Sequence, residues 1–196
     1  MTAVPEALTP ALLVRAYCAG FFPMADARHG RIRWYSPDPR AVIPLAAFHV
    51  PRSLRRTVRR GRFEVRVNEA FGDVIRACAD RAETWISDEI VRAYEALHTL
   101  GLAHSVETWR DGRLVGGLYG VALGGAFFGE SMFSRETDAS KVALVALVAR
   151  LRERGFVLLD IQFLTPHLAR FGAVEIPRAE YLRRLDEALQ LDCRFA

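Results

Sequence analysis

Three runs of strand-forming residues in the middle of the chain limit the possible folds most. They lie at 104–110, 114–121 and 126–133, and glycine-containing turns separate them at 111–112 and 124–125. Asp-Gly between alternating apolar and polar residues is a strong hairpin signal. We therefore expect an antiparallel meander of three strands.

A helix at 140–153 and a strongly apolar strand at 156–163 follow the meander. A helical crossover normally joins parallel strands, so we expect this last strand to pair in parallel. The other expected elements are helices at about 10–19, 52–62, 69–79, 87–101 and 178–191, a short helix that opens at 165, and strands near 31–35, 63–68 and 173–176. This order predicts an α+β, GNAT-like acyltransferase fold: a mixed, largely antiparallel sheet flanked by helices.

Glycine and proline punctuate the first 40 residues, which are typical of turns and short elements. We expect a short N-terminal subdomain at 1–40 and a GNAT-like catalytic domain at 41–196. Three widely spaced cysteines without a CxxC pair argue against a disulfide framework or a structural zinc site. The longest uncharged run is shorter than a typical membrane span, and no signal peptide is visible. We expect a cytoplasmic protein with no membrane partner and no metal.

Positive charge is concentrated near the amino terminus. Residues 1–62 contain eleven arginines and three acidic residues, a net charge of +8, whereas the remainder carries −4. The charge peaks in the segment 52–62, which holds Arg52, Arg55, Arg56, Arg59, Arg60 and Arg62. Such a cluster is an electrostatic footprint for a polyanion such as RNA, and a solvated helix face is the alternative.

Two carboxylates stand in otherwise apolar or small surroundings. Glu130 lies in the segment 129–135, and Asp160 lies in Asp160-Ile161-Gln162 on the apolar strand. A charge in such a place is costly unless it has a partner or a function. For Glu130 the structural alternative is a salt bridge with Arg135 or an exposed position, and for Asp160 it is a cap near a strand end. Gln162 is two positions from Asp160, so both side chains should lie on one strand face.

The turn before the 140–153 helix bears on coenzyme A. GNAT-type acetyltransferases bind the pyrophosphate of coenzyme A with a glycine-rich turn at this place. Here residues 135–140 contain no glycine and add two acidic residues. This argues against coenzyme A, and we expect no cofactor.

Several long motifs occur in an order that resembles one family, the leucyl/phenylalanyl-tRNA–protein transferases. They are Trp34-Tyr35-Ser36-Pro37-Asp38-Pro39-Arg40, Thr84-Trp85-Ile86, His104-Ser105-Val106-Glu107, the glycine-rich stretch 116–121, the segment 129–135, Ala139-Ser140-Lys141, Asp160-Ile161-Gln162 and Phe171-Gly172-Ala173. Compared with many members, a longer N-terminal strand segment is absent, so we expect 1–40 to be a truncated subdomain. Met24 stands where some members carry tryptophan.

The resemblance implies an aminoacyltransferase that moves Leu or Phe, with Met as a further candidate, from aminoacyl-tRNA to proteins with N-terminal Arg or Lys. The product is marked for degradation by the N-degron pathway. A tRNA substrate accounts for the arginine cluster. An apolar donor side chain requires an apolar pocket, for which the candidates by position are Trp85, Leu118, Phe127, Met132, Leu144 and Leu159. Core packing is the alternative for each.

The implied reaction is attack of a protein α-amine on an aminoacyl ester. Asp160 is our candidate to orient or deprotonate the amine, because apolar neighbours would raise its pKa. Gln162 would position the amine, and Glu130 would engage the cationic acceptor. A coenzyme A-dependent acetyltransferase and a non-catalytic RNA-binding module are the alternative functions.

Overall fold

The computed structural model describes residues 8–26 and 30–196. In this part of the chain, β1 (Phe22–Ala25) and β2 (Ile32–Tyr35) form a small antiparallel hairpin. Seven further strands form one sheet in the order β4-β5-β6-β7-β8-β3-β9. They are β3 (Arg40–Val42), β4 (Glu64–Val67), β5 (Ala103–Arg110), β6 (Arg113–Leu123), β7 (Ala126–Ser134), β8 (Leu158–Gln162) and β9 (Val174–Ile176).

Pairing in the large sheet is antiparallel except between β7 and β8. The expected meander is β5-β6-β7, and its first turn has the positive φ angles of a hairpin, 51° at Asp111 and 72° at Gly112. The prediction of a mixed, largely antiparallel sheet is confirmed, including the parallel pairing after the helical crossover.

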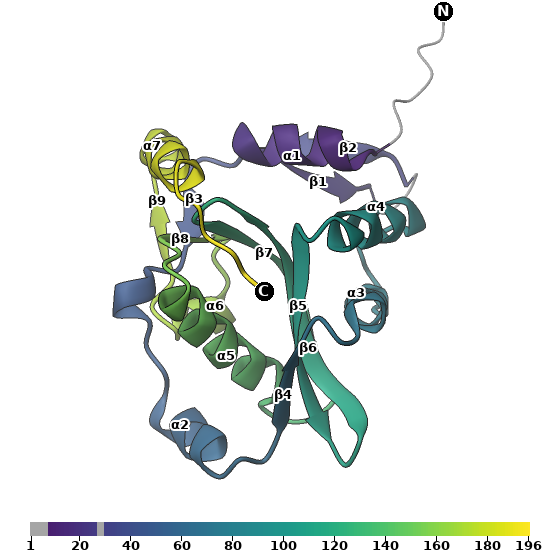
Figure 1. Cartoon of the computed structure of the whole chain (residues 1–196), viewed down its shortest axis with the longest axis vertical. Coiled ribbons are helices and arrows are strands. Elements are labelled where there is room, and N and C mark those ends of the chain that lie inside the picture. Colours follow the sequence, from purple (N-terminus) through teal and green to yellow (C-terminus); the bar gives the residue numbers. More distant parts are fainter. Residues whose placement is uncertain (1–7, 27–29) are drawn as a thin grey trace, which may run out of the picture.

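Helices flank both faces of the sheet (Figure 1). They are α1 (Pro10–Cys18), α2 (Arg52–Arg59), α3 (Phe71–Ala79), α4 (Asp88–Thr99), α5 (Ala139–Glu153), α6 (Pro166–Ala169) and α7 (Arg178–Leu189), with a 3-10 turn η1 (Leu45–Ala47). Figure 1 shows α5 on one side of β5 and β6, and α3 and α4 on the other. In the described residues, no helix is long and apolar enough to cross a membrane.

The apolar side chains form two clusters, one on each face. The first cluster joins α1, α3, α4 and α7 to the sheet, with Tyr17, Ile90 and Tyr119 among its fully buried members. The second joins α2 and α5 to the other face and includes Phe127 and the C-terminal Phe195. The N-terminal elements therefore share a core with α3 and α4.

The sequence did not reveal β1 or β3. β3 has only three residues, all buried, so it shows no alternation, and it lies between β8 and β9 inside the large sheet. It also crosses the boundary expected between residues 40 and 41. Residues 1–7 and 27–29 of the expected N-terminal subdomain lie outside the described residues.

Candidate active site

The two parallel strands separate where the chemistry was expected. β7 pairs with β8 only from Ala126↔Leu158 to Phe128↔Asp160, whereas its pairing with β6 continues to Ser134. Beyond Phe128, the β8-facing edge of β7 has no strand partner in the described part of the chain. A cavity of about 250 Å³ opens beside this edge.

A β-bulge lies on each strand at the split. On β7, Gly129 is opposite Gly120 and Ser131 is opposite Tyr119, so Glu130 is the extra residue. On β8, Ile161 is the extra residue opposite β3. Bulges re-aim side chains and often occur beside active sites. The bulge on β7 turns Glu130 toward the cavity.

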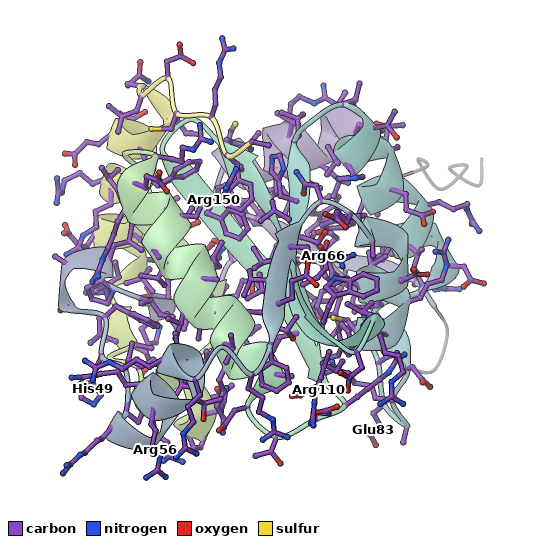
Figure 2. All side chains as sticks on the ribbon, turned by 60° about the horizontal axis from the view of Figure 1, so that its bottom comes forward. His49, Arg56, Arg66, Glu83, Arg110 and Arg150 are labelled. Carbon is purple, nitrogen blue, oxygen red and sulfur yellow. The ribbon has the colours of Figure 1, made fainter. Side chains whose placement is uncertain are left out.

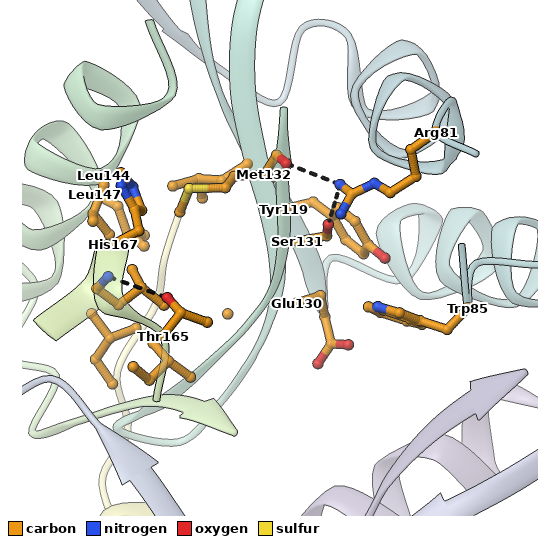
Figure 3. A pocket seen from close by; sticks show the side chains of 15 residues that line it. Arg81, Trp85, Tyr119, Glu130, Ser131, Met132, Leu144, Leu147, Thr165 and His167 are labelled. Carbon is orange, nitrogen blue, oxygen red and sulfur yellow. Dashed lines mark hydrogen bonds between the residues drawn. The ribbon is translucent and has the colours of Figure 1, made fainter. Parts of the chain in front are cut away.

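The cavity has an apolar half and a polar half (Figure 3). The apolar half is lined by Leu118, Met132, Leu144, Leu147, Leu159, Ile161 and Leu168. The polar half is lined by Arg81, Trp85, Tyr119, Glu130 and Ser131, and Thr165 and His167 lie at the α6 side. Figure 3 shows Met132, Leu144 and Leu147 on one side of β7, and Arg81, Trp85 and Tyr119 on the other.

Five of the six predicted pocket residues line this cavity: Trp85, Leu118, Met132, Leu144 and Leu159. Phe127 does not, and its assignment to the pocket is wrong. Its ring is fully buried and packs 5.1 Å from the ring of Phe195 in the second cluster. The core-packing alternative is therefore correct for Phe127.

Glu130 is a buried carboxylate with hydrogen-bond donors around it. The Tyr17 hydroxyl donates to Oε1 at 2.7 Å, and the Gln162 amide donates to the same oxygen at 2.8 Å. Tyr94 approaches Oε2 at 3.4 Å and also bonds to Tyr17. The structural alternative for Glu130 is wrong, because Arg135 instead donates to the backbone oxygen of Leu114.

Burial raises the pKa of Glu130 to about 7. The negative charge of Asp160 adds to this shift, while the hydrogen bonds from Tyr17 and Tyr94 and the charge of Arg40 oppose it. A carboxylate with a pKa near neutrality can exchange a proton with an amine at physiological pH.

Asp160 does not have the apolar surroundings that the sequence predicted. It is fully buried, and Arg40 of β3 donates to its two oxygens at 2.9 and 2.6 Å. The Tyr181 hydroxyl donates to Oδ2 at 2.9 Å. Asp160 does not line the cavity. The expected apolar environment of Asp160 is wrong, because a cation holds both oxygens, and its role toward the amine stays a prediction.

Gln162 connects the two carboxylates. It has a φ of 60°, and its backbone N–H donates to Oδ1 of Asp160 at 2.9 Å. Its side-chain amide reaches Glu130. Left-handed backbone is uncommon for a residue other than glycine, so a local hydrogen bond of this kind helps to hold it. The chain of contacts from Arg40 through Asp160 and Gln162 to Glu130 positions the carboxylate at the cavity.

The basic segment lies on α2 and after it, away from the interior. Leu54 is buried against the second cluster and anchors the helix, while the arginines are exposed. Arg56 extends outward at the edge of the molecule (Figure 2). In the described residues, no carboxylate forms an ion pair with Arg52, Arg55, Arg56, Arg59 or Arg60. Arg62 pairs with Glu136 at 3.3 Å.

Five side chains that shape the site were not assigned to it from the sequence: Tyr17, Arg40, Arg81, Tyr94 and Tyr119. Arg40 ends one of the quoted motifs, and Tyr94 lies in the helix that was expected at 87–101. Except for Tyr119, each meets its hydrogen-bond partner across a long sequence separation. In residues 8–26 and 30–196, no group of His, Cys, Asp and Glu side chains could hold a metal ion.

Comparison with known proteins now assigns the chain. The model of the leucyl/phenylalanyl-tRNA protein transferase family matches residues 42–186, and the model of that family's N-terminal domain matches residues 6–38. The chain belongs to the leucyl/phenylalanyl-tRNA–protein transferase family. Its similarity to the relatives of that name extends over almost the whole chain. The protein from Rubrobacter xylanophilus is 65% identical over 190 residues, which cover 96% of this chain and 99% of the relative. The one from Gloeobacter violaceus is 61% identical over 188 residues, which cover 96% and 97%.

Similarity to solved structures is weaker. The C-terminal domain of a putative lysylphosphatidylglycerol synthetase from Agrobacterium fabrum is 15% identical, with a TM-score of 0.43, over 94% of this chain and 60% of that one. The family assignment rests on the sequence relatives. As a member of this transferase family, the protein is an aminoacyltransferase that moves an amino acid from aminoacyl-tRNA to the amino terminus of a protein.

Proposed function

We propose that Glu130 receives the amino-terminal residue of the acceptor protein and takes the proton that its α-amine loses. The observation that carries this proposal is the position of Glu130. Of the described residues that line the cavity, only Glu130 carries a carboxylate. Its pKa lies near 7. A free α-amine has a pKa of about 8, so proton transfer to Glu130 is close to balanced.

The donor amino acid occupies the apolar half of the cavity. Met132, Leu144 and Leu159 offer hydrocarbon surface to a Leu or Phe side chain. Burial of such a side chain contributes about 1.5–3 kcal/mol of binding, which favours these donors over polar ones. The tRNA body lies against the exposed arginines of α2, whose charges face solvent without acidic partners in the described residues.

The chemical step is aminolysis of an ester. The lone pair of the unprotonated α-amine forms a C–N bond to the aminoacyl carbonyl carbon, and the C–O bond to the terminal ribose breaks. The proton that leaves the nitrogen passes through Glu130 to the ribose oxygen. Gln162 and Tyr17 hold the Glu130 carboxylate in place, and Asp160 and Arg40 support Gln162 from behind. Much of the rate then comes from positioning two bound substrates.

The negative charge of Glu130 favours acceptor proteins with N-terminal Arg or Lys. Glu130 attracts the cationic amino-terminal residue, and the tyrosines around it provide further polar contacts. The aminoacylated product would carry a new apolar amino terminus, which marks it for degradation by the N-degron pathway. Because aminoacyl-tRNA is made in the cytoplasm, we place the reaction there.

The likeness to GNAT acyltransferases, with a short subdomain at 1–40 and a catalytic domain at 41–196, is part of the same proposal. The separation of two parallel strands at the cavity supports it. Coenzyme A is disfavoured. Near the start of α5, where its pyrophosphate would bind, Glu136 pairs with Arg62 and Arg110 and Asp138 pairs with Lys141. These ion pairs occupy the turn, and residues 135–140 contain no glycine that would let backbone amides approach a pyrophosphate.

The test compares donors and acceptors in one assay. Labelled leucyl-tRNA or acetyl-coenzyme A is offered with peptides that begin with Arg, Lys or norleucine, which resembles Lys without its charge. We expect transfer only from leucyl-tRNA, with Arg and Lys preferred. Glu130→Gln should reduce the rate by about 10²–10⁴-fold, and Glu175→Gln, an exposed carboxylate on β9, is the matched control. Transfer from acetyl-coenzyme A would indicate an acetyltransferase. RNA binding without any transfer would indicate a non-catalytic RNA-binding module.

A further inference from the structure

One residue that lines the cavity, Tyr119, carries a buried hydroxyl that lacks a hydrogen-bond partner within the described residues. Tyr119 is fully buried on β6, and its hydroxyl is without a partner among the described residues. Phe71 and Tyr94 hold its ring edge-on, at centroid distances of 5.9 and 5.7 Å. Native proteins pair nearly all such groups, because an unpaired buried hydroxyl is destabilising. A hydroxyl that is left unpaired on a residue lining a substrate cavity indicates a ligand group that pairs with it.

A second donor, Arg81, lies nearby, and no described carboxylate forms an ion pair with it. Arg81, in the loop between α3 and α4, donates from Nη2 to the Ser131 hydroxyl and to the Met132 backbone oxygen, both at 3.2 Å. Both acceptors are neutral, and neither bond uses Nη1 or Nε. Figure 3 shows Arg81 and Tyr119 on the same side of β7. The charge of Arg81 also acts on the Tyr119 hydroxyl.

Both residues are neighbours of Ser131. Tyr119 is directly opposite Ser131 in the β6–β7 register, and Arg81 bonds to Ser131 itself. On β7, Ser131 lies between Glu130 and Met132, that is, between the polar and apolar halves of the cavity. If the amine is at Glu130 and the donor side chain is at Met132, the ester carbonyl must lie between them.

We propose that the Tyr119 hydroxyl and the Arg81 guanidinium donate hydrogen bonds to the carbonyl oxygen of the aminoacyl ester. This inference rests on the proposed positions of the two substrates. As the amine attacks, the carbonyl π electrons move to this oxygen and give a tetrahedral oxyanion. The carbonyl re-forms when the bond to the ribose oxygen breaks. Burial raises the pKa of Tyr119 well above its ordinary value, so its hydroxyl remains a donor at neutral pH.

The experiment is single-turnover transfer with both substrates saturating, which isolates the chemical step. Loss of one oxyanion donor typically costs about 10²–10³-fold in rate. We expect Tyr119→Phe and Arg81→Ala each to approach that loss, with Arg81→Lys in between because it keeps the charge. Affinity for aminoacyl-tRNA should change little. The matched control is Tyr35→Phe, a half-buried tyrosine of β2 outside the cavity.

Stability separates a catalytic role from a structural one. Tyr119→Phe removes an unpaired buried hydroxyl, so its Tm should stay the same or rise. The inference fails if Tyr119→Phe keeps the wild-type single-turnover rate, or if the loss is confined to Arg- and Lys-initiated peptides. The second result would assign the hydroxyl to the acceptor side chain. Equal wild-type transfer to the norleucine peptide would contradict the proposed acceptor preference, but the comparison of Tyr119 variants would still stand.

Discussion

Asp160 and Arg40 form a bidentate ion pair that solvent does not reach. Their side chains are 0% and 1% exposed, and 120 residues separate them along the chain. The Arg40 guanidinium also lies over the rings of Phe22 and Tyr181, at 4.8 and 4.4 Å from their centroids. The pair joins β3 to β8 and fixes the oxygen that accepts the Gln162 N–H. Asp160 therefore holds the backbone of Gln162 beside the cavity.

Asp160→Asn should destabilise the fold, slow transfer and move the pH limb set by Glu130 to lower pH without abolishing it, because the Asp160 charge contributes to the raised pKa of Glu130. Removal of one charge from a buried pair typically costs about 3–5 kcal/mol, because the other charge remains uncompensated. Urea unfolding measures this loss, and pH–rate profiles test the role. Asp186→Asn on the exposed side of α7 is the control. Unchanged stability would contradict the structural role of the ion pair, and disappearance of the pH limb, rather than its shift, would show that Asp160 acts directly on the proton.

The rate of transfer should rise with pH through the pKa of Glu130. If the ionised carboxylate is needed, kcat/KM increases as the pH passes about 7, and ionisation of the acceptor α-amine near pH 8 extends the rise. In Glu130→Gln the limb near 7 should disappear, and the limb of the amine should remain. An acceptor peptide whose α-amine has a lower pKa tests this assignment. Only the limb of the amine should move to lower pH, and the limb of Glu130 should stay.

Glu130 should also make the fold less stable as pH rises. Its native pKa of about 7 exceeds the ordinary value of 4.5, so the native state holds a proton that the unfolded state has released. The associated stabilisation is fully present below about pH 4.5 and is lost as pH rises through 7. By linkage this amounts to roughly 3 kcal/mol. Urea unfolding from pH 5 to 8 should show the decline in the wild type and a smaller one in Glu130→Gln; equal slopes would refute the raised pKa.

Local signals explain which parts of the fold the sequence revealed. The meander, its Asp-Gly turn and the crossover strand depend on neighbouring residues, and those predictions were confirmed. β3 was missed because three buried residues carry no periodic pattern. The environment of Asp160 was predicted wrongly for a related reason. Its apolar sequence neighbours gave no sign that Arg40 would lie against it.

The bulge at Glu130 explains both the success and the error in the pocket prediction. Phe127 and Met132 are an odd number of positions apart, yet both contact the second cluster, because one extra residue shifts the alternation. The alternation of apolar and polar residues along the strand could not distinguish Phe127, which is buried in the second cluster, from Met132, which lines the cavity. The sequence therefore placed the candidate residues on the strand segment beside the cavity, and the split between β7 and β8 determines which side chains line it.

Met132→Ala should mainly reduce activity, whereas Phe127→Ala should mainly reduce stability. Met132 is half-buried and lines the cavity, so its loss should reduce kcat/KM for leucyl- and phenylalanyl-tRNA by about 10–200-fold, with a small effect on unfolding. Phe127 is fully buried in the core, so its loss should cost about 3–5 kcal/mol of stability. The kinetics of Phe127→Ala should be measured well below its Tm. A large Tm loss in Met132→Ala with unchanged kinetics would move Met132 to the core.

Neutralising the exposed arginines of α2 should weaken tRNA binding and flatten its salt dependence. When a phosphate contact is lost, tRNA binding releases fewer counterions. The slope of the logarithm of the binding constant against the logarithm of salt concentration should therefore become shallower by up to about 0.7–0.9 for each lost contact. The quadruple variant replaces Arg55, Arg56, Arg59 and Arg60 by Gln and leaves Leu54 to anchor the helix.

The control for this quadruple variant replaces Arg183 and Arg184 by Gln. On α7, Arg183 is exposed and Arg184 is half-buried, and both pair with Glu180, so they test whether any loss of positive charge has the same effect. Binding of aminoacyl-tRNA is measured between 50 and 200 mM salt, and transfer is measured at saturating tRNA. Because α2 lies outside the cavity, the rate at saturation should be retained. An unchanged salt slope in the quadruple variant would show that the α2 arginines form only a solvated face.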